Sequence, residues 1–230
     1  MIKFKFDVTD EQKETILLSV IFERWHTNIT NNFDVKSITI RDVIWFGSRV
    51  GFLFVEADAY FEGRKVPGVA FLRGDSVSIM PIFSVENKKD LYTALVIEPR
   101  IPIGVNSQPS LPAGMIDDES FESAAIKELG EELGTDIKVS RDDLVFLDKF
   151  PLSCGGSDEY MSLFYFDYQL SEEQFKSLDG RNTGENEFEN IKVKLIPVDE
   201  LLHIQNLDAR STLSYYLWRK KIDTKEHSNL

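Results

Sequence analysis

The chain has 230 residues, 42% of them hydrophobic and 28% charged, which suits one large globular domain or two small ones. Its formal net charge is -13, from 39 acidic and 26 basic residues, and such a surface argues against a nucleic-acid partner. The single cysteine, Cys154, excludes an internal disulfide and favours a reducing compartment. No run is apolar enough to cross a bilayer and the start resembles no signal peptide, so we expect a cytoplasmic protein without a membrane partner.

The histidines limit the metal chemistry that the chain could support. His26, His203 and His227 lie far apart, and none is spaced from Cys154 as zinc ligands would be. A bound metal would therefore be held by carboxylates. Carboxylate oxygens favour Mg²⁺, with Mn²⁺ as the alternative.

The first part of the chain predicts one helix followed by strands. Thr9 and Gln12 have the spacing of a capping box, and apolar residues recur at helical spacing behind them, which predicts an amphipathic helix over residues 10–27. The pattern then becomes β-like, with Gly47 and Gly63 at the breaks. Strands are predicted over residues 37–46, 50–60 and 66–71.

The second part contains the clearest helix, predicted over residues 120–133, where apolar residues form a packing stripe and Gly134 stands at the position of a C-terminal cap. The polar segment 86–90 reads as a hairpin loop between two strands. Strands are predicted over residues 77–83, 91–98, 144–150, 161–169 and 191–197, and a final helix over residues 207–221. This order predicts the α+β class, with a weakly marked domain boundary near residues 62–68.

Three carboxylates on the predicted helix share one face. Glu128, Glu131 and Glu132 are three and four residues apart, so their side chains can aim at a common point. Their mutual repulsion destabilises the helix, and Gly130 costs roughly another 1 kcal/mol compared with alanine. A divalent cation would offset the repulsion. The alternative is an ordinary solvated helix face, which an isolated triplet of this kind would favour.

The surrounding residues favour the metal site, because they resemble the Nudix hydrolase signature G-x5-E-x7-R-E-U-x-E-E-x-G-U, where U is apolar. Glu119 is followed by seven residues and then by Lys127-Glu128-Leu129-Gly130-Glu131-Glu132-Leu133-Gly134. The chain departs from the signature at three points. Gly114 precedes Glu119 by four intervening residues instead of five, Lys127 replaces arginine, and Thr135 takes the last apolar place. Lysine offers a mobile point charge where arginine offers a rigid fork.

The resemblance extends from about residue 37 to the last helix and is greatest to the ADP-sugar diphosphatase branch, relatives of ADP-ribose pyrophosphatase. The similar stretches are residues 45–53, 65–69, 98–102, 111–115, 153–159 and 179–193. The resemblance implies a Nudix α/β/α sandwich preceded by a small β-rich domain, here residues 67–230 and 1–66. It also implies a homodimer in which the N-terminal domain shapes the partner's substrate site.

Site residues carry over from the family by position. The resemblance makes Glu128 and Glu132 the main Mg²⁺ ligands. It implies that Glu131 is a further ligand and also a catalytic residue, and that the main-chain carbonyl of Ala113 contributes another ligand. Glu119 would orient Lys127 or a water molecule bound to the metal. The residues implied to bind substrate are Arg100, Gly114, Gly155, Gly156 and Glu159. Arg100 suits bidentate phosphate contact, although a surface ion pair explains an arginine equally well.

The general base is expected on the acidic segment 184–191. Counting back from Ile191, Glu187 fits the base and Glu189 an additional metal ligand, with Glu185 as a substitute for the base. A solvated acidic loop is the alternative. Cys154 has no histidine nearby in sequence to activate it, so we interpret it as structural.

The resemblance implies Mg²⁺-dependent hydrolysis of the diphosphate bond of a nucleoside diphosphate sugar. ADP-ribose or ADP-glucose would yield AMP and a sugar phosphate. Two alternatives remain open: a hydrolase of UDP- or GDP-sugars, NADH or nucleoside triphosphates, and a catalytically weak nucleotide-binding protein on the same scaffold. Aromatic residues that could stack on a base are plentiful, and the sequence does not choose among Trp45, Phe46, Phe52 and Phe54.

Overall fold

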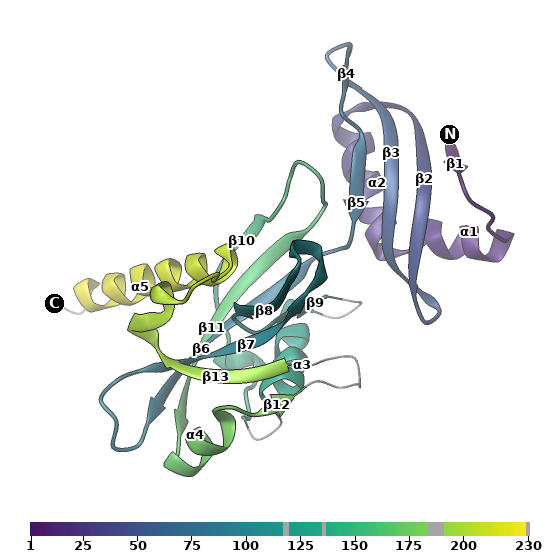
Figure 1. The fold of residues 1–230 in the computed structure, drawn as a ribbon. Helices are drawn as coiled ribbons and strands as arrows, with labels where there is room; N and C mark the ends of the chain where they lie inside the picture. The colour runs from purple at the N-terminus through teal and green to yellow at the C-terminus, as the bar shows by residue number, and fades with distance from the viewer. Residues whose placement is uncertain (117–119, 135–136, 184–190, 229–230) are drawn as a thin grey trace. The chain divides into compact units, whose positions relative to one another are not determined.

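The computed structural model describes residues 1–116, 120–134, 137–183 and 191–228, and its side chains up to residue 224. The chain divides into two compact units (Figure 1). The first contains Met1–Asp75 and Phe150–Tyr160, and the second contains Ser76–Lys149 and Met161–Leu230. No helix in the described part of the chain has the length and apolarity to span a bilayer.

The first unit begins with two helices where the sequence predicts one. The capping box at Thr9 starts α1 (Asp10–Leu17), and Ser19 caps a separate α2 (Val20–Asn32) by accepting from the main-chain amide of Phe22. The prediction of a single helix over residues 10–27 was therefore wrong. The serine cap competes with helix continuation, because it satisfies an amide that a continuous helix would pair internally.

A five-stranded sheet packs against these helices (Figure 1). The strands are β1 (Ile2–Phe4), β2 (Asp34–Phe46), β3 (Arg49–Phe61), β4 (Arg64–Val66) and β5 (Val69–Leu72). The strand predicted over residues 66–71 is interrupted at Gly68, whose carbonyl accepts from the amide of Ala57 at 2.8 Å. Alternate residues of the sheet face the helices, as a sheet with one covered face requires.

The segment Phe150–Tyr160 belongs to this first unit, although it is remote in sequence. Asp158 explains why: its Oδ1 accepts from the main-chain amide of Arg73 at 2.8 Å, and its Oδ2 lies 2.7 Å from Arg24. The observed division follows Asp75, whereas the sequence places the boundary after residue 66. Strand β5 pairs with β3, which keeps residues 69–72 in the first unit.

The second unit is built on a mixed eight-stranded sheet in the order β10-β11-β6-β7-β13-β12, with β8 paired to β7 and β9 paired to β6. Its strands are β6 (Ser76–Val85), β7 (Tyr92–Arg100), β8 (Val105–Ser110), β9 (Ala113–Met115), β10 (Val145–Pro151), β11 (Tyr160–Leu170), β12 (Asn182–Thr183) and β13 (Ile191–Pro197). β6 runs parallel to β11 and antiparallel to β7. The longer strands match their predicted positions, and the three short strands β8, β9 and β12 were not predicted.

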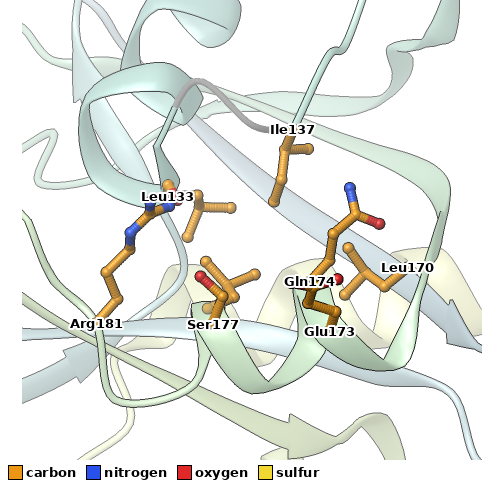
Figure 2. A pocket seen from close by; sticks show the side chains of 8 residues that line it. Leu133, Ile137, Leu170, Glu173, Gln174, Ser177 and Arg181 are labelled. Carbon is orange, nitrogen blue, oxygen red and sulfur yellow. Dashed lines mark hydrogen bonds between the residues drawn. The ribbon is translucent and has the colours of Figure 1, made fainter.

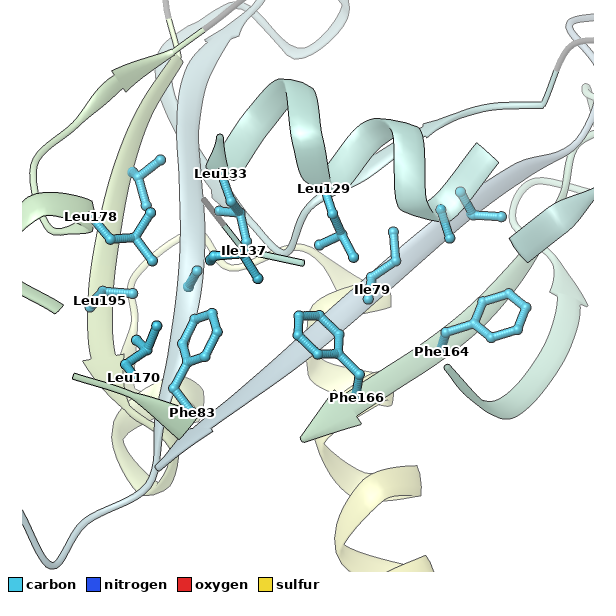
Figure 3. Close-up of a cluster of buried hydrophobic side chains, with 14 of the residues drawn as sticks. Ile79, Phe83, Leu129, Leu133, Ile137, Phe164, Phe166, Leu170, Leu178 and Leu195 are labelled. Carbon is cyan, nitrogen blue, oxygen red and sulfur yellow. The ribbon is translucent and has the colours of Figure 1, made fainter. Parts of the chain in front are cut away.

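Helices cover both faces of this sheet. On one face, α3 (Phe121–Leu133) and α4 (Glu172–Leu178) enclose a core that contains Ile79, Phe83, Leu129 and Phe166 (Figure 3). On the other face, α5 (Ala209–Ser228) contributes Trp218 to a second core. The three-layer sandwich and the α+β class are therefore confirmed.

Candidate active site

Helix α3 carries the carboxylates and begins and ends as predicted. Ser120 caps it by accepting from the amide of Ser123, and Gly134 ends it with a φ of 96°. Leu129 and Leu133 face the core, so the helix cannot rotate without exposing them. This packing directs Glu132 inward, where it is 5% exposed. The interpretation of a purely solvated face therefore does not hold for Glu132.

Strand β9 brings the loop before the helix against the same carboxylates. Its register with β6 pairs Gly114 with Val77 and Ala113 with Ser78. The main-chain amide of Ala113 donates to Oε2 of Glu132 at 3.2 Å. A Cβ built on Gly114 would overlap the carboxylate of Glu128. Gly114 is thus a glycine because Glu128 fills the space that a side chain would need.

The electrostatic state of Glu132 reflects its surroundings. Burial, followed by the negative charges of Glu128 and Glu98, raises the pKa of Glu132 well above its ordinary value. Arg210 and the Ala113 amide act in the opposite direction. Negative charge is therefore concentrated around a buried carboxyl group. A bound cation would relieve that repulsion.

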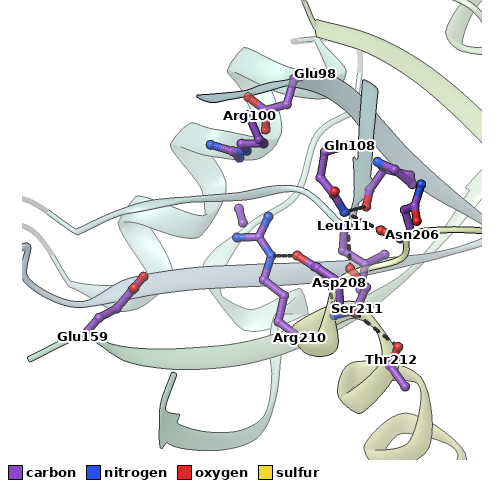
Figure 4. Close-up of polar contacts among 12 residues, drawn as sticks. Glu98, Arg100, Gln108, Leu111, Glu159, Asn206, Asp208, Arg210, Ser211 and Thr212 are labelled. Carbon is purple, nitrogen blue, oxygen red and sulfur yellow. Dashed lines mark hydrogen bonds and ion pairs between the residues drawn. The ribbon is translucent and has the colours of Figure 1, made fainter. Parts of the chain in front are cut away.

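Glu98 and Arg210 are neighbours of the site that the sequence did not assign. Glu98 lies near the end of β7 and pairs with Arg100, and Arg210 at the start of α5 pairs with Asp208 (Figure 4). In the sequence, Glu98 was marked only by its place in residues 98–102, one of the stretches that resemble the family. Nothing in the local sequence marks Arg210, because only the tertiary fold brings α5 to the sheet.

The start of α5 and the turn before it also support the loop that leads to β9. The main-chain amide of Leu111 donates to Oγ of Ser211 at 2.9 Å, and the side chain of Gln108 donates to the carbonyl oxygen of Asn206 (Figure 4). The two anchors tie the segment before Ala113 to a second element of the fold. They limit the movement of the Ala113 carbonyl.

Lys127 and Glu131 occupy the outer side of the helix. Their side chains form an ion pair across one helical turn, with Nζ 3.4 Å from Oε1. Lys127 is half exposed and Glu131 is 20% exposed. Glu131 therefore lies on the more open side of α3, whereas Glu132 is buried.

Several predicted site residues cannot be placed beside this cluster. Glu119, Glu185, Glu187 and Glu189 lie outside the described residues. Gly155, Gly156 and Glu159 belong to the first unit. There the carbonyl of Gly156 accepts from the amide of Phe71 at 2.8 Å, and the buried carboxylate of Glu159 lies 3.5 Å from Arg73. Their roles toward substrate stay predictions.

The two ends of the acidic segment are nevertheless placed. Thr183 and Ile191 are direct partners in the antiparallel pairing of β12 with β13. The hydroxyl of Thr183 donates to the main-chain carbonyl of Glu132 at 2.7 Å. Thr183, which precedes this segment in the sequence, is therefore held at the end of α3.

The donor set fits a divalent cation of the Mg²⁺ type. The side chains that gather here offer carboxylate oxygens, and Gly114 leaves room beside Glu128. Within the described residues, no three acidic, histidine or cysteine side chains stand close enough to enclose an ion in this conformation. A complete coordination shell thus needs a side-chain adjustment, or donors beyond these described side chains: the main chain, the substrate, water or other carboxylates of the chain.

Comparison with known proteins identifies the family. Residues 73–216 match the NUDIX domain. The chain is 36% identical over 223 residues to Nudix hydrolase 14, chloroplastic, from Arabidopsis thaliana, across 87% of this chain and 70% of that protein. The chain belongs to the Nudix hydrolase family. A solved structure described as "Crystal structure of ADP compounds hydrolase" has a similar fold, with a TM-score of 0.57 and 18% identity over 84% of this chain and 96% of that one.

Proposed function

We propose that the protein is a Mg²⁺-dependent hydrolase of the diphosphate bond in nucleoside diphosphate sugars, with ADP-ribose or ADP-glucose as the preferred class. The observation that carries the proposal is the burial of Glu132 beside Glu128 and Glu98. A protein that used this surface only for solubility would gain nothing from burying one carboxylate among others. Mn²⁺ is the alternative ion.

Glu128 and Glu132 would hold the metal, assisted by Glu131, Glu189 and the carbonyl oxygen of Ala113. A divalent cation bound there would neutralise the diphosphate and lower the pKa of a water molecule. The amide of Ala113 keeps the Glu132 carboxylate oriented by donating to it. Glu119 would orient Lys127.

Side chains of the protein would bind the substrate phosphate and accept the proton. Arg100 would exchange its contact with Glu98 for a substrate phosphate, since a guanidinium matches phosphate geometry. Glu187 would accept the proton of the attacking water, with Glu185 as the substitute. The products would be AMP and a sugar phosphate.

The substrate class rests on two supports. The sequence resembles the ADP-sugar branch of the family, and the structural neighbour is described as a hydrolase of ADP compounds. Gly114, Gly155, Gly156 and Glu159 would contribute to substrate binding. The alternative substrates for the same reaction are UDP-sugars, GDP-sugars and NADH.

The test is turnover of ADP-ribose, ADP-glucose, UDP-glucose, NADH and ATP with Mg²⁺, followed by chromatography of the products. Glu132→Gln is the control, because it removes one charge and keeps the shape. AMP and a sugar phosphate from the wild type alone would support the proposal. A ligand that raises the melting temperature without turnover would instead favour a nucleotide-binding protein.

We also propose that the chain forms a homodimer through the uncovered face of the first unit's sheet. Phe54 and Phe71 are direct cross-strand partners there, with exposures of 44% and 37%, and Ile44 and Val69 are also exposed. An apolar surface of this kind is typical of an interface between proteins. Sedimentation equilibrium of the wild type and of Phe54→Glu tests this, since a monomeric wild type would exclude it.

A further inference from the structure

The last turn of α3 is held from outside the helix. The hydroxyl of Thr183 donates to the main-chain carbonyl of Glu132 at 2.7 Å, and the guanidinium of Arg181 donates to the carbonyl of Leu133 at 3.2 Å. The final carbonyls of any helix lack intrahelical donors, so this turn is the part of a helix that unwinds most readily. Glu132 stands one residue before the helix ends. The buried carboxylate therefore depends on a turn that is intrinsically weak.

The two donors are themselves fixed to the central sheet. The main-chain amide of Gly180 donates to the carbonyl oxygen of Val193 at 2.9 Å. The amide of Val193 in turn donates to the carbonyl oxygen of Arg181 at 2.8 Å. Asp179 accepts from the amide of Leu195 through its side chain at 2.9 Å. Strand β13 is thus the support against which the end of α3 is held.

Gly134 makes room for the arginine. Its φ of 96° lies in the region that disfavours side chains, and a Cβ there would overlap the guanidinium of Arg181. Leu133 and Arg181 also line a cavity of about 230 Å³ between the end of α3 and α4 (Figure 2). Packing on this side is incomplete, so hydrogen bonds have a larger share in holding the turn.

We propose that Arg181 and Thr183 form a carbonyl clamp, meaning the pair of side chains that bind the last carbonyls of α3, and that this clamp positions Glu132 for the metal. The inference rests on the proposed function. In this proposal both residues act through Glu132 and not on the ion or the substrate. Without the clamp, the last turn would sample unwound states, and metal would bind only the fraction of molecules in which Glu132 is in place.

The matched variants are Thr183→Val, which removes the donor and keeps the shape, and Thr183→Ser, which keeps the donor. The probe is Mn²⁺, titrated calorimetrically into metal-free protein without substrate. Loss of one hydrogen bond predicts Mn²⁺ binding weaker by about three- to ten-fold in Thr183→Val. Thr183→Ser is expected to bind like the wild type. Arg181→Met and Arg181→Lys form a second pair, in case Thr183→Val does not fold.

The clamp also predicts a particular kinetic pattern. The Mg²⁺ concentration for half-maximal activity would rise in Thr183→Val and Arg181→Met, while kcat at saturating Mg²⁺ would stay close to the wild-type value. A folded Thr183→Val that melts earlier but binds Mn²⁺ as tightly as the wild type would overturn the clamp and leave the proposed function intact. A wild-type protein that binds no Mn²⁺ or Mg²⁺ would overturn the proposed function itself.

Discussion

Gly114 lies so close to Glu128 that a Cβ on the glycine would overlap the glutamate carboxylate. The contact joins the loop before α3 to the helix, and it concerns the far end of a flexible side chain. Gly114→Ala would therefore displace the Glu128 carboxylate and leave the fold in place. We expect a fall in kcat/KM of about 100-fold, since a displacement on the order of 1 Å at a catalytic group has that effect.

Steady-state kinetics and thermal unfolding of Gly114→Ala check this expectation together. A melting temperature near that of the wild type with the predicted loss of activity would agree with a displaced ligand. Wild-type activity in this variant would mean that the position of Glu128 does not matter for the reaction. Failure to fold would show that the loop, and not the side chain, has to move.

Gly130 provides the matched control on the same helix. A Cβ there meets no atom within 4 Å, and the residue lies in the helix interior. Gly130→Ala should raise the free energy of unfolding by about 0.5–1 kcal/mol, because alanine loses less backbone entropy in a helix. Activity should not change. Urea denaturation measures the gain, and a loss of stability would contradict the open space around position 130.

The sequence was most informative where one helix or strand determines its own ends. The helix predicted over residues 120–133 with Gly134 at its end matches α3, since capping is a local property. The break at Ser19 was missed because apolar residues at helical spacing continue through it. Arg210 was missed for another reason: its distance in sequence from α3 hides a proximity that only the fold creates.

In the metal-free protein, the buried carboxyl group of Glu132 should lower the free energy of unfolding at neutral pH. The raised pKa of Glu132 means that, above its ordinary value of 4.5, the folded state keeps a proton that the unfolded state releases. Stability is therefore lost as the pH rises from there through the folded pKa. Glutamine carries no such charge, so Glu132→Gln should be more stable than the wild type at neutral pH, and the difference should shrink as the pH falls.

Chemical denaturation in chelator across this pH range measures the difference, and the same series with Mg²⁺ supplies the contrast. Added Mg²⁺ should stabilise the wild type and have little effect on the variant, since binding to the folded state raises its stability. An equal pH slope in both proteins without metal would show that Glu132 is already charged at no cost.

The first unit offers a prediction that is independent of catalysis. Arg24 lies 2.5 Å from Oδ1 of Asp75 and 2.7 Å from Oδ2 of Asp158, whose side chains are 11% and 6% exposed. Arg24→Leu would leave both carboxylates with little access to water, and we expect a loss of about 2 kcal/mol in the free energy of unfolding. Arg41→Leu is the control, because Arg41 pairs with Glu56 at the surface and its loss should change stability by less than about 0.5 kcal/mol. Urea unfolding followed by tryptophan fluorescence compares them, and equal losses would mean that burial of the Asp75 and Asp158 carboxylates does not matter.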